Sequence, residues 1–315
     1  MFALKHTILK ERRSLAMNYI SVFLSSLPGA CAQGLAWGIM ALGVYLTFRI
    51  LNTSDLTVDG SLATGGAVCV ALMTAGVSTG VAILAAITAG MLAGLITGLL
   101  HTKCGIPAIL AGILTQLSLY SINLRIMGGR ANTPVSVDKY DLLVSQRYVR
   151  RLDLSNPIPV FLIIIVVIIA LLYWFFGTEL GSSIRATGNN EHMAKAQGVN
   201  TSRNKVLGFC VANGLVALSG ALIAQYQGAA DVNMGRGAIV IGLASVIISE
   251  VLFGKLFKNF GLKMLAVVFG SVIYYIVLQL VLTLGLNTND LKLFSALIVA
   301  IFLAIPYFKG GKKDA

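Results

Sequence analysis

Residues 158–177 read IPVFLIIIVVIIALLYWFFG and contain no charged side chain. About 20 apolar residues in a helix are enough to cross the roughly 30 Å hydrocarbon core of a membrane. The rest of the chain has the same character, since 57% of its 315 residues are hydrophobic and 11% are charged, with a mean hydropathy of +0.85. These values exclude a soluble domain and predict an all-α bundle of transmembrane helices.

Eight further apolar runs bring the predicted number of spans to nine, within a single transmembrane domain of residues 1–315. Charge is absent from the runs at 79–100, 264–289, 105–124 and 206–230. The shorter or more interrupted runs are 30–48, 60–80, 237–254 and 293–308.

The amino terminus, residues 1–28, is a basic extension. It begins with Lys5, Lys10, Arg12 and Arg13 and continues into an apolar stretch, as a signal peptide does. Another apolar run follows directly, which disfavours cleavage. We expect either a short surface helix or an additional span, which would be the tenth.

Basic residues between the spans predict the orientation. From residue 178 onward, ten of them fall in the segments 178–205, 255–263 and 309–313. Because basic residues are retained on the cytoplasmic side, we predict that 178–205 and 309–315 are cytoplasmic and that 128–157 is external. The external segment carries five basic and three acidic residues. It is either a docking surface or a solvated loop at the membrane surface.

Composition excludes several chemistries. The net charge of +12 lies mainly between apolar runs and forms no basic face with interleaved aromatic residues, so no nucleic-acid partner is expected. The four cysteines and three histidines lack the spacing of a metal site. No P-loop, nucleophile elbow or carboxylate pair is present. An enzyme is therefore the minority hypothesis, and energy for pumping would come from another chain.

Glycines at helical spacing mark a packing face on the 79–100 span. Gly90, Gly94 and Gly98 form two successive steps of small residues four apart, which let a neighbouring helix approach closely. The neighbour is either another helix of the same bundle or the same face of a second subunit.

A weak internal repeat relates the two halves of the chain. A shift of 176 residues places Ala41, Leu42 and Asp55 on Ala217, Leu218 and Asp231. If four spans, one linking span and four more make up the nine, the two units form an inverted pair. Chance similarity is the alternative, because few identities carry the match.

Charged residues next to the first two spans need partners, because a carboxylate within a membrane is costly. Asp59 precedes Gly60 and is expected to cap the following helix. Asp55 is a candidate cavity residue, and Arg49 is a candidate partner for either aspartate. Glu250 is expected to extend to the cytoplasmic interface near Lys255.

The predicted cytoplasmic side contains one compact polar helix candidate, IRATGNNEHMAKAQGVN, residues 184–200. Together with two other strings, it resembles the membrane permeases of ABC importers in the branched-chain amino acid and ribose superfamily. The other strings are LGVYLTFRILNTSDLTVDGSLATGGAV, residues 42–68, and ALSGALIAQYQGAADVNMGRGAIVIGLASVIISEVLFG, residues 217–254. Within the superfamily, the string at residues 42–68 most resembles permeases for amino acids, aromatic ones included. The basic amino-terminal extension departs from the pattern.

The resemblance implies a plasma-membrane permease, in contact with membrane lipid, that forms a homodimer, with a heterodimer as the alternative. It would receive solute from an external binding protein and dock two cytoplasmic ATPase subunits, which bind ATP and magnesium. This chain would need no cofactor of its own. Within the loop 178–205, the residues implied in ATPase coupling are Arg185, Gly188, Asn189, Asn190, Glu191, Lys195 and Gly198.

We place the solute pathway between the two repeat units, where interrupted helices expose backbone groups. The candidate lining residues are Asn52, Ser54, Asp55, Gln116, Gln225 and Asp231. An amino acid ranks first because Asp55 could bind its ammonium group. The alternatives are a sugar or nucleoside importer and a secondary transporter, which would need more intramembrane acids than this chain has.

Overall fold

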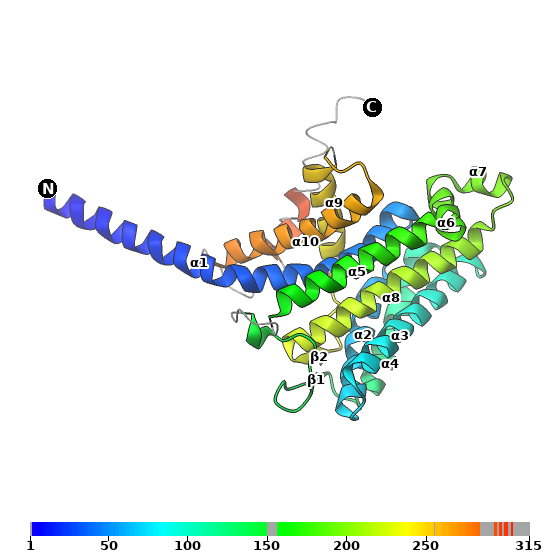
Figure 1. Cartoon of the computed structure of the whole chain (residues 1–315), viewed down its shortest axis with the longest axis horizontal. Coiled ribbons are helices and arrows are strands. Elements are labelled where there is room, and N and C mark those ends of the chain that lie inside the picture. The colour runs from blue at the N-terminus through cyan, green and yellow to red at the C-terminus, as the bar shows by residue number, and fades with distance from the viewer. Residues whose placement is uncertain are drawn as a thin grey trace.

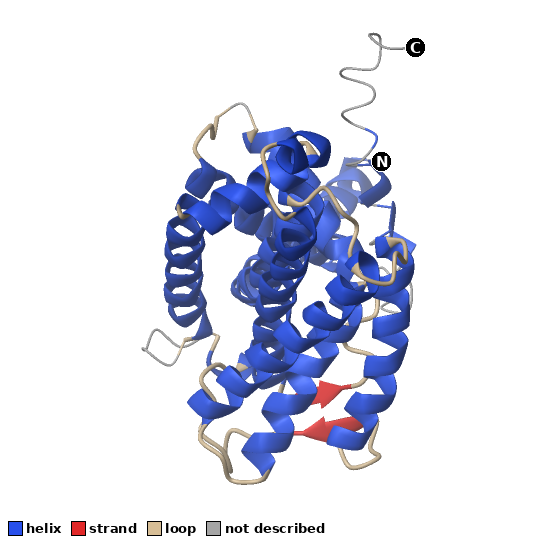
Figure 2. Cartoon of the chain, turned by 90° about the vertical axis from the view of Figure 1, so that its right-hand side faces the viewer, coloured by secondary structure: helices blue, strands red, loops and turns tan. Residues whose placement is uncertain are grey.

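The computed structural model describes residues 2–149, 156–254 and 256–283, with isolated positions between 293 and 304; the side chains of residues 2–20 lie outside this description. The chain is a bundle of long helices (Figures 1 and 2). The longer helices are α1 (Phe2–Tyr45), α2 (Thr57–Thr74), α3 (Thr79–Thr102), α4 (Ala108–Ile126), α5 (Pro157–Gly177), α8 (Thr201–Gln227), α9 (Ala238–Phe253) and α10 (Phe260–Thr283). The shorter elements are the π-helical turn η1 (Leu46–Ile50), the 3₁₀ turn η2 (Gln146–Tyr148), α6 (Glu179–Asn189), α7 (Glu191–Ala196), β1 (Asn132–Pro134) and β2 (Ala229–Asp231).

Seven helices in the described part of the chain are long and apolar enough to cross a membrane, which confirms the multi-pass helical fold. The predicted count of nine or ten is too high for this part. The run at 237–254 forms α9, whose 16 residues are fewer than the roughly 20 that a span needs. The predicted span at 293–308 and the tail at 309–315 lie largely or wholly outside the described residues.

The amino-terminal extension forms neither a separate surface helix nor a separate tenth span. Residues 2–45 make one continuous helix, α1, with Pro28 inside it. At 1.5 Å per residue its 44 residues reach about 66 Å, roughly twice the hydrocarbon thickness. Its first half therefore projects beyond the bundle (Figure 1).

The packing of the helices repeats between the two halves of the chain. α1 packs on α10 as α8 packs on α3, and α2 packs on α3 as α9 packs on α10. α1 and α8 also contact each other at the centre. They run in opposite directions along the bundle, as α1 ends near α6 whereas α8 starts there (Figure 1). This arrangement has the form of an inverted pair, with α5 as the odd helix between the two units.

The bundle has two distinct ends. α6 and α7 lie at one end, called here the coupling end, and β1 and β2 lie near the opposite one (Figure 1). The two strands pair antiparallel, with Thr133 opposite Ala230. This sheet was not predicted, because strands of three residues carry no periodic pattern. It ties the segment after α4 to the connection between α8 and α9.

The glycine face of α3 packs inside the chain. A Cβ added to Gly90 or Gly94 would overlap the backbone carbonyls of Asn213 or Phe209 on α8, and one on Gly98 would press on Val206. Only glycine allows two backbones to approach this closely. Of the two predicted neighbours for this face, the structure therefore shows a helix of the same chain, α8.

Candidate functional site

The polar segment at the coupling end folds as two helices rather than one. α6 ends at Asn189, and Asn190 is extended, with φ −156° and ψ 102°. The Asn190 side chain accepts a hydrogen bond from the Met193 backbone N–H at 3.0 Å and so caps α7. Asparagine favours this cap over continuing the helix, and the break follows from that preference. Thr178 caps α6 in the same way through the Gly181 N–H.

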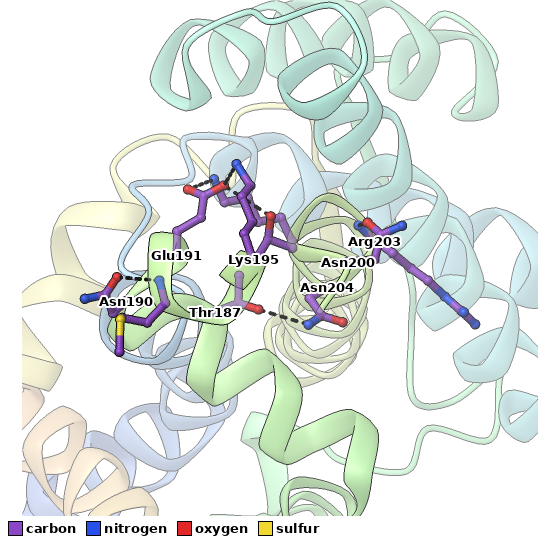
Figure 3. Close-up of polar contacts among 10 residues, drawn as sticks. Thr187, Asn190, Glu191, Lys195, Asn200, Arg203 and Asn204 are labelled. Atoms are coloured by element: carbon purple, nitrogen blue, oxygen red, sulfur yellow. Dashed lines mark hydrogen bonds and ion pairs between the residues drawn. The ribbon is translucent and has the colours of Figure 1, made fainter. Parts of the chain in front are cut away.

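α6 is fixed to the bundle by backbone contact and hydrogen bonds. Ile184 is buried, and a Cβ on Gly188 would overlap the Ile50 carbonyl oxygen at the end of η1. On the other side, the Asn204 amide of α8 donates to the Thr187 hydroxyl at 2.9 Å (Figure 3). It also donates to the Ser183 hydroxyl at 2.7 Å. Both Thr187 and Asn204 are buried, so α6 cannot shift without breaking these bonds.

Glu191 connects α7 to α8. Its carboxylate lies 3.0 Å from the Lys195 ammonium and 2.7 Å from that of Lys205, and it accepts a bond from the Thr201 hydroxyl (Figure 3). The bonds from Lys205 and then Lys195 lower the pKa of Glu191 from its ordinary value of 4.5 to about 2. The carboxylate therefore stays charged at neutral pH and holds the short helix in place.

The outward face of this segment is polar and open. Among the residues implied in coupling, Arg185, Asn189, Asn190, Lys195 and Gly198 are exposed. Gly198 ends α7 with φ +80°, a conformation that favours glycine. Next to them, Met193 is 62% exposed and offers an apolar anchor. A rigid, solvent-facing platform of this kind suits protein docking.

A second group of polar residues forms a hydrogen-bonded cluster inside the bundle, called here the central polar cluster. All its members are at most 3% exposed and come from the start of α2 and from α3, α4 and α8. They are Asp55, Thr57, Ser61, Thr97, Thr115 and Asn213.

Asn213, near the middle of α8, organises the cluster. Its amide donates to the Asp55 carboxylate at 2.7 Å and to the Phe209 carbonyl at 3.0 Å. Its own oxygen accepts from the Ser61 hydroxyl at 2.6 Å. The other Asp55 oxygen accepts from the Thr57 backbone N–H at 2.9 Å, so Asp55 caps α2.

Three threonine hydroxyls extend the cluster across the bundle. Thr97 of α3 lies 2.7 Å from the Thr57 hydroxyl and donates to Thr115 of α4 at 2.9 Å. The cluster therefore joins α2, α3 and α4 of the first repeat unit to α8 of the second. Asn213 was missed from the sequence, although an amide in the middle of an apolar span is a recognisable signal.

Asp59 has a different partner from the one predicted. Its carboxylate accepts from the backbone N–H groups of Gly237 and Ile239, both at 2.9 Å, and so caps α9 instead of its own helix. The α9 terminus lies against α2, and a Cβ on Gly235 would overlap the Asp59 carbonyl. Arg49, the predicted partner of an aspartate, instead lies 2.7 Å from Glu250. Helix packing brings these two residues together at the coupling end.

The predicted solute-pathway residues do not converge. Asn52, with φ +53°, and Ser54 are exposed on the connection before α2, whereas Asp55 is buried. Gln116 is half-buried on α4. The two others lie towards the sheet end. Gln225 is buried and accepts from the Leu143 N–H at 3.0 Å, and Asp231 lies in β2, where it accepts from the Asn233 N–H at 2.7 Å.

Comparison with known families agrees with this architecture. Residues 27–306 match the family described as branched-chain amino acid transport system / permease component. The chain belongs to this permease family. The match covers six of the seven spans in the described residues completely and the first from residue 27, together with the α6–α7 segment and the central polar cluster, so the protein is a multi-pass ABC permease.

Two relatives are named for different solutes. The permease is 41% identical over 281 residues to the tyrosine transport system permease protein of Clostridioides difficile, covering 89% of this chain and 91% of that one. It is 29% identical over 212 residues to the ribose import permease protein RbsC of Bacillus subtilis, covering 67% and 64%. A solved structure, PsaBC from Streptococcus pneumoniae in complex with Fab, matches with a TM-score of 0.54 at 18% identity, over 91% of this chain and 95% of that one. That likeness shows the shared fold.

The Glu191 ion pairs predict a pH dependence for the α6–α7 segment. Because the folded pKa lies below the unfolded one, the stabilisation is complete above about pH 4.5 and is lost as pH falls toward 2. The side chain is 34% exposed, so we expect Glu191→Gln to cost only about 1–2 kcal/mol at pH 7. Thermal unfolding of both proteins at pH 7 and pH 3 measures this difference, which should shrink at pH 3.

The matched control is Glu179→Gln on α6, since Glu179 forms no ion pair within the described residues. A difference between wild type and Glu191→Gln that is equal at both pH values would contradict the role assigned to this carboxylate.

Proposed function

We propose that this permease is the membrane subunit of an ABC importer that moves an amino acid inward across the plasma membrane, with aromatic amino acids first. Separate cytoplasmic ATPase subunits would drive it, and an external binding protein would deliver the solute. The observation that carries the proposal is the 41% identity to a tyrosine transport permease over nearly the full length of both chains.

The coupling end supports the place proposed for the ATPase contact. α6 and α7 expose Arg185, Asn189 and Lys195 on a platform that Asn204 and Glu191 hold rigidly. Because α6 touches the end of η1 through its backbone, a push on the platform would reach α1 and the connection to α2 directly. We infer the cytoplasmic placement of this end from its basic residues.

We place the solute pathway along the boundary of the two repeat units, next to the central polar cluster. In this conformation both Asp55 oxygens are occupied by Asn213 and Thr57. An ammonium group would reach Asp55 only after α2 and α8 separate. Exposed Ser54 and Asn52 lie on the approach from the coupling end.

Uptake by the reconstituted importer tests the proposal. The permease would be produced with a candidate ABC ATPase and a candidate solute-binding protein. It would be placed in vesicles with ATP enclosed on the side of the coupling end and the binding protein on the other side. We expect ATP-dependent accumulation of radiolabelled tyrosine, with phenylalanine and tryptophan as competitors. Accumulation of ribose or a nucleoside instead would reject the solute class. Uptake driven by a proton gradient without the ATPase would reject the importer mechanism.

A further inference from the structure

A large cavity opens at the coupling end, beside the α6–α7 platform. Its volume is about 1460 Å³, and its walls come from the ends of η1, α5 and α9, from α6 and from the start of α10. Pockets for small solutes typically measure roughly 300–1,000 Å³, so this one has room for a bulkier occupant.

The cavity carries an excess of positive charge. Four basic residues line it and only one carboxylate, Glu250, which Arg49 pairs at 2.7 Å. The other three basic residues, Arg185, Lys258 and Lys263, form no ion pair within the described residues. α10 begins at Phe260 in the same wall and adds the positive end of its helix dipole.

The remaining wall is aromatic, and its residues are of the kind that lies at a membrane interface. The Arg185 guanidinium lies 5.0 Å from the centroid of the Phe260 ring, and Phe253 stacks on Phe257. Tyr173 lines the cavity at the end of the 21-residue span α5 and is 52% exposed, and its neighbour Trp174 is 70% exposed. Exposed tyrosine and tryptophan at a span end mark the headgroup level of the bilayer.

From the volume, the unpaired cations and the aromatic rim together, we infer that this cavity binds the headgroup of an anionic phospholipid. Lys258 and Lys263 would bind the phosphate, and the phenylalanine wall would contact the upper acyl chains. Basic pockets between spans bind acidic lipids in this way. The bound lipid would bridge α6 to the start of α10 and so support the platform.

Trp174 provides a direct reporter. The chain has two tryptophans, so Trp37→Phe leaves Trp174, the sequence neighbour of the cavity residue Tyr173, as the single tryptophan. The purified variant would be reconstituted with phosphatidylglycerol or phosphatidylcholine carrying brominated chains, at equal mole fraction. We expect stronger quenching by phosphatidylglycerol than by phosphatidylcholine. In the double variant Lys258→Gln/Lys263→Gln, the preference for phosphatidylglycerol over phosphatidylcholine should fall about 30-fold. Lys103→Gln, an exposed lysine outside the cavity, should retain the preference.

Three results would overturn the inference: equal quenching by the two lipids, an unchanged preference in the double variant, or displacement of the lipid by free glycerol phosphate, which would indicate a soluble ligand. Native mass spectrometry of phosphatidylglycerol bound to the chain with both tryptophans provides a second measurement if Trp37→Phe does not fold. Neither measurement needs the ATPase or the solute, so both stand apart from the test of amino acid uptake.

Discussion

Replacing Gly188 by alanine is expected to reduce ATP-driven uptake by more than about tenfold while the protein still inserts in the membrane. The added Cβ would overlap the Ile50 carbonyl, a backbone atom that cannot rotate away. α6 would have to move off η1, and overpacking of this kind costs about 1–3 kcal/mol. Because α6 is also held by Asn204, the shift would strain the whole platform. Uptake measures the loss of transport, and co-purification of the ATPase measures whether the strained platform still binds it.

The matched control is Gly177→Ala at the end of α5. A Cβ there meets no atom within 4 Å, and Gly177 is not among the glycines with positive φ. This variant should transport like wild type. If Gly188→Ala also does so, then contact between α6 and η1 is not needed for coupling.

Breaking the central polar cluster is expected to have the second large effect. Asn213→Ala removes the side-chain donor to the buried Asp55 carboxylate and leaves the Ser61 hydroxyl without its acceptor. A buried polar group that loses its partner costs about 1–3 kcal/mol, and a charged group costs more. We therefore expect a loss of about 2–4 kcal/mol in the free energy of unfolding. Chemical denaturation in mild detergent measures it.

A double-mutant cycle isolates the bond between Asp55 and Asn213. Asp55→Ala, Asn213→Ala and the double variant should show a coupling energy of about 1–3 kcal/mol, because the carboxylate oxygen that loses its donor in Asn213→Ala is absent from the double variant. The control Thr88→Ala removes an exposed hydroxyl that bonds only within α3 and should change stability little. Additive effects would show that the two side chains act independently.

Asp55→Asn separates the structural role of this residue from its proposed role in transport. The Asn213 amide and the Thr57 N–H both donate to this side chain. The new amide has only one acceptor oxygen, so in either orientation one of these two buried donors loses its acceptor. Stability should fall by about 1–3 kcal/mol. If tyrosine uptake per folded molecule stays at the wild-type level, Asp55 does not belong to the solute pathway.

The sequence was sufficient for the features that depend on neighbouring residues. Uncharged runs of about 20 residues located the spans, because each helix must satisfy its backbone hydrogen bonds within one segment of a membrane. The polar segment at 184–200 and the glycine face at Gly90, Gly94 and Gly98 were recognisable for the same local reason. Short or irregular segments escaped prediction, such as the break at Asn190 and the paired strands, and so did the continuity of α1 and the role of Asn213.

Tertiary structure alone decided which partners these features have. Asp59 caps α9, about 180 residues away in the chain, and Arg49 pairs with Glu250 instead of an aspartate. Asn213 and Asp55 meet because α8 crosses the start of α2, and α3 can join them because its glycines admit the α8 backbone. A side chain selects its partner by what the packing of distant helices brings within about 3 Å, and no local pattern encodes that distance.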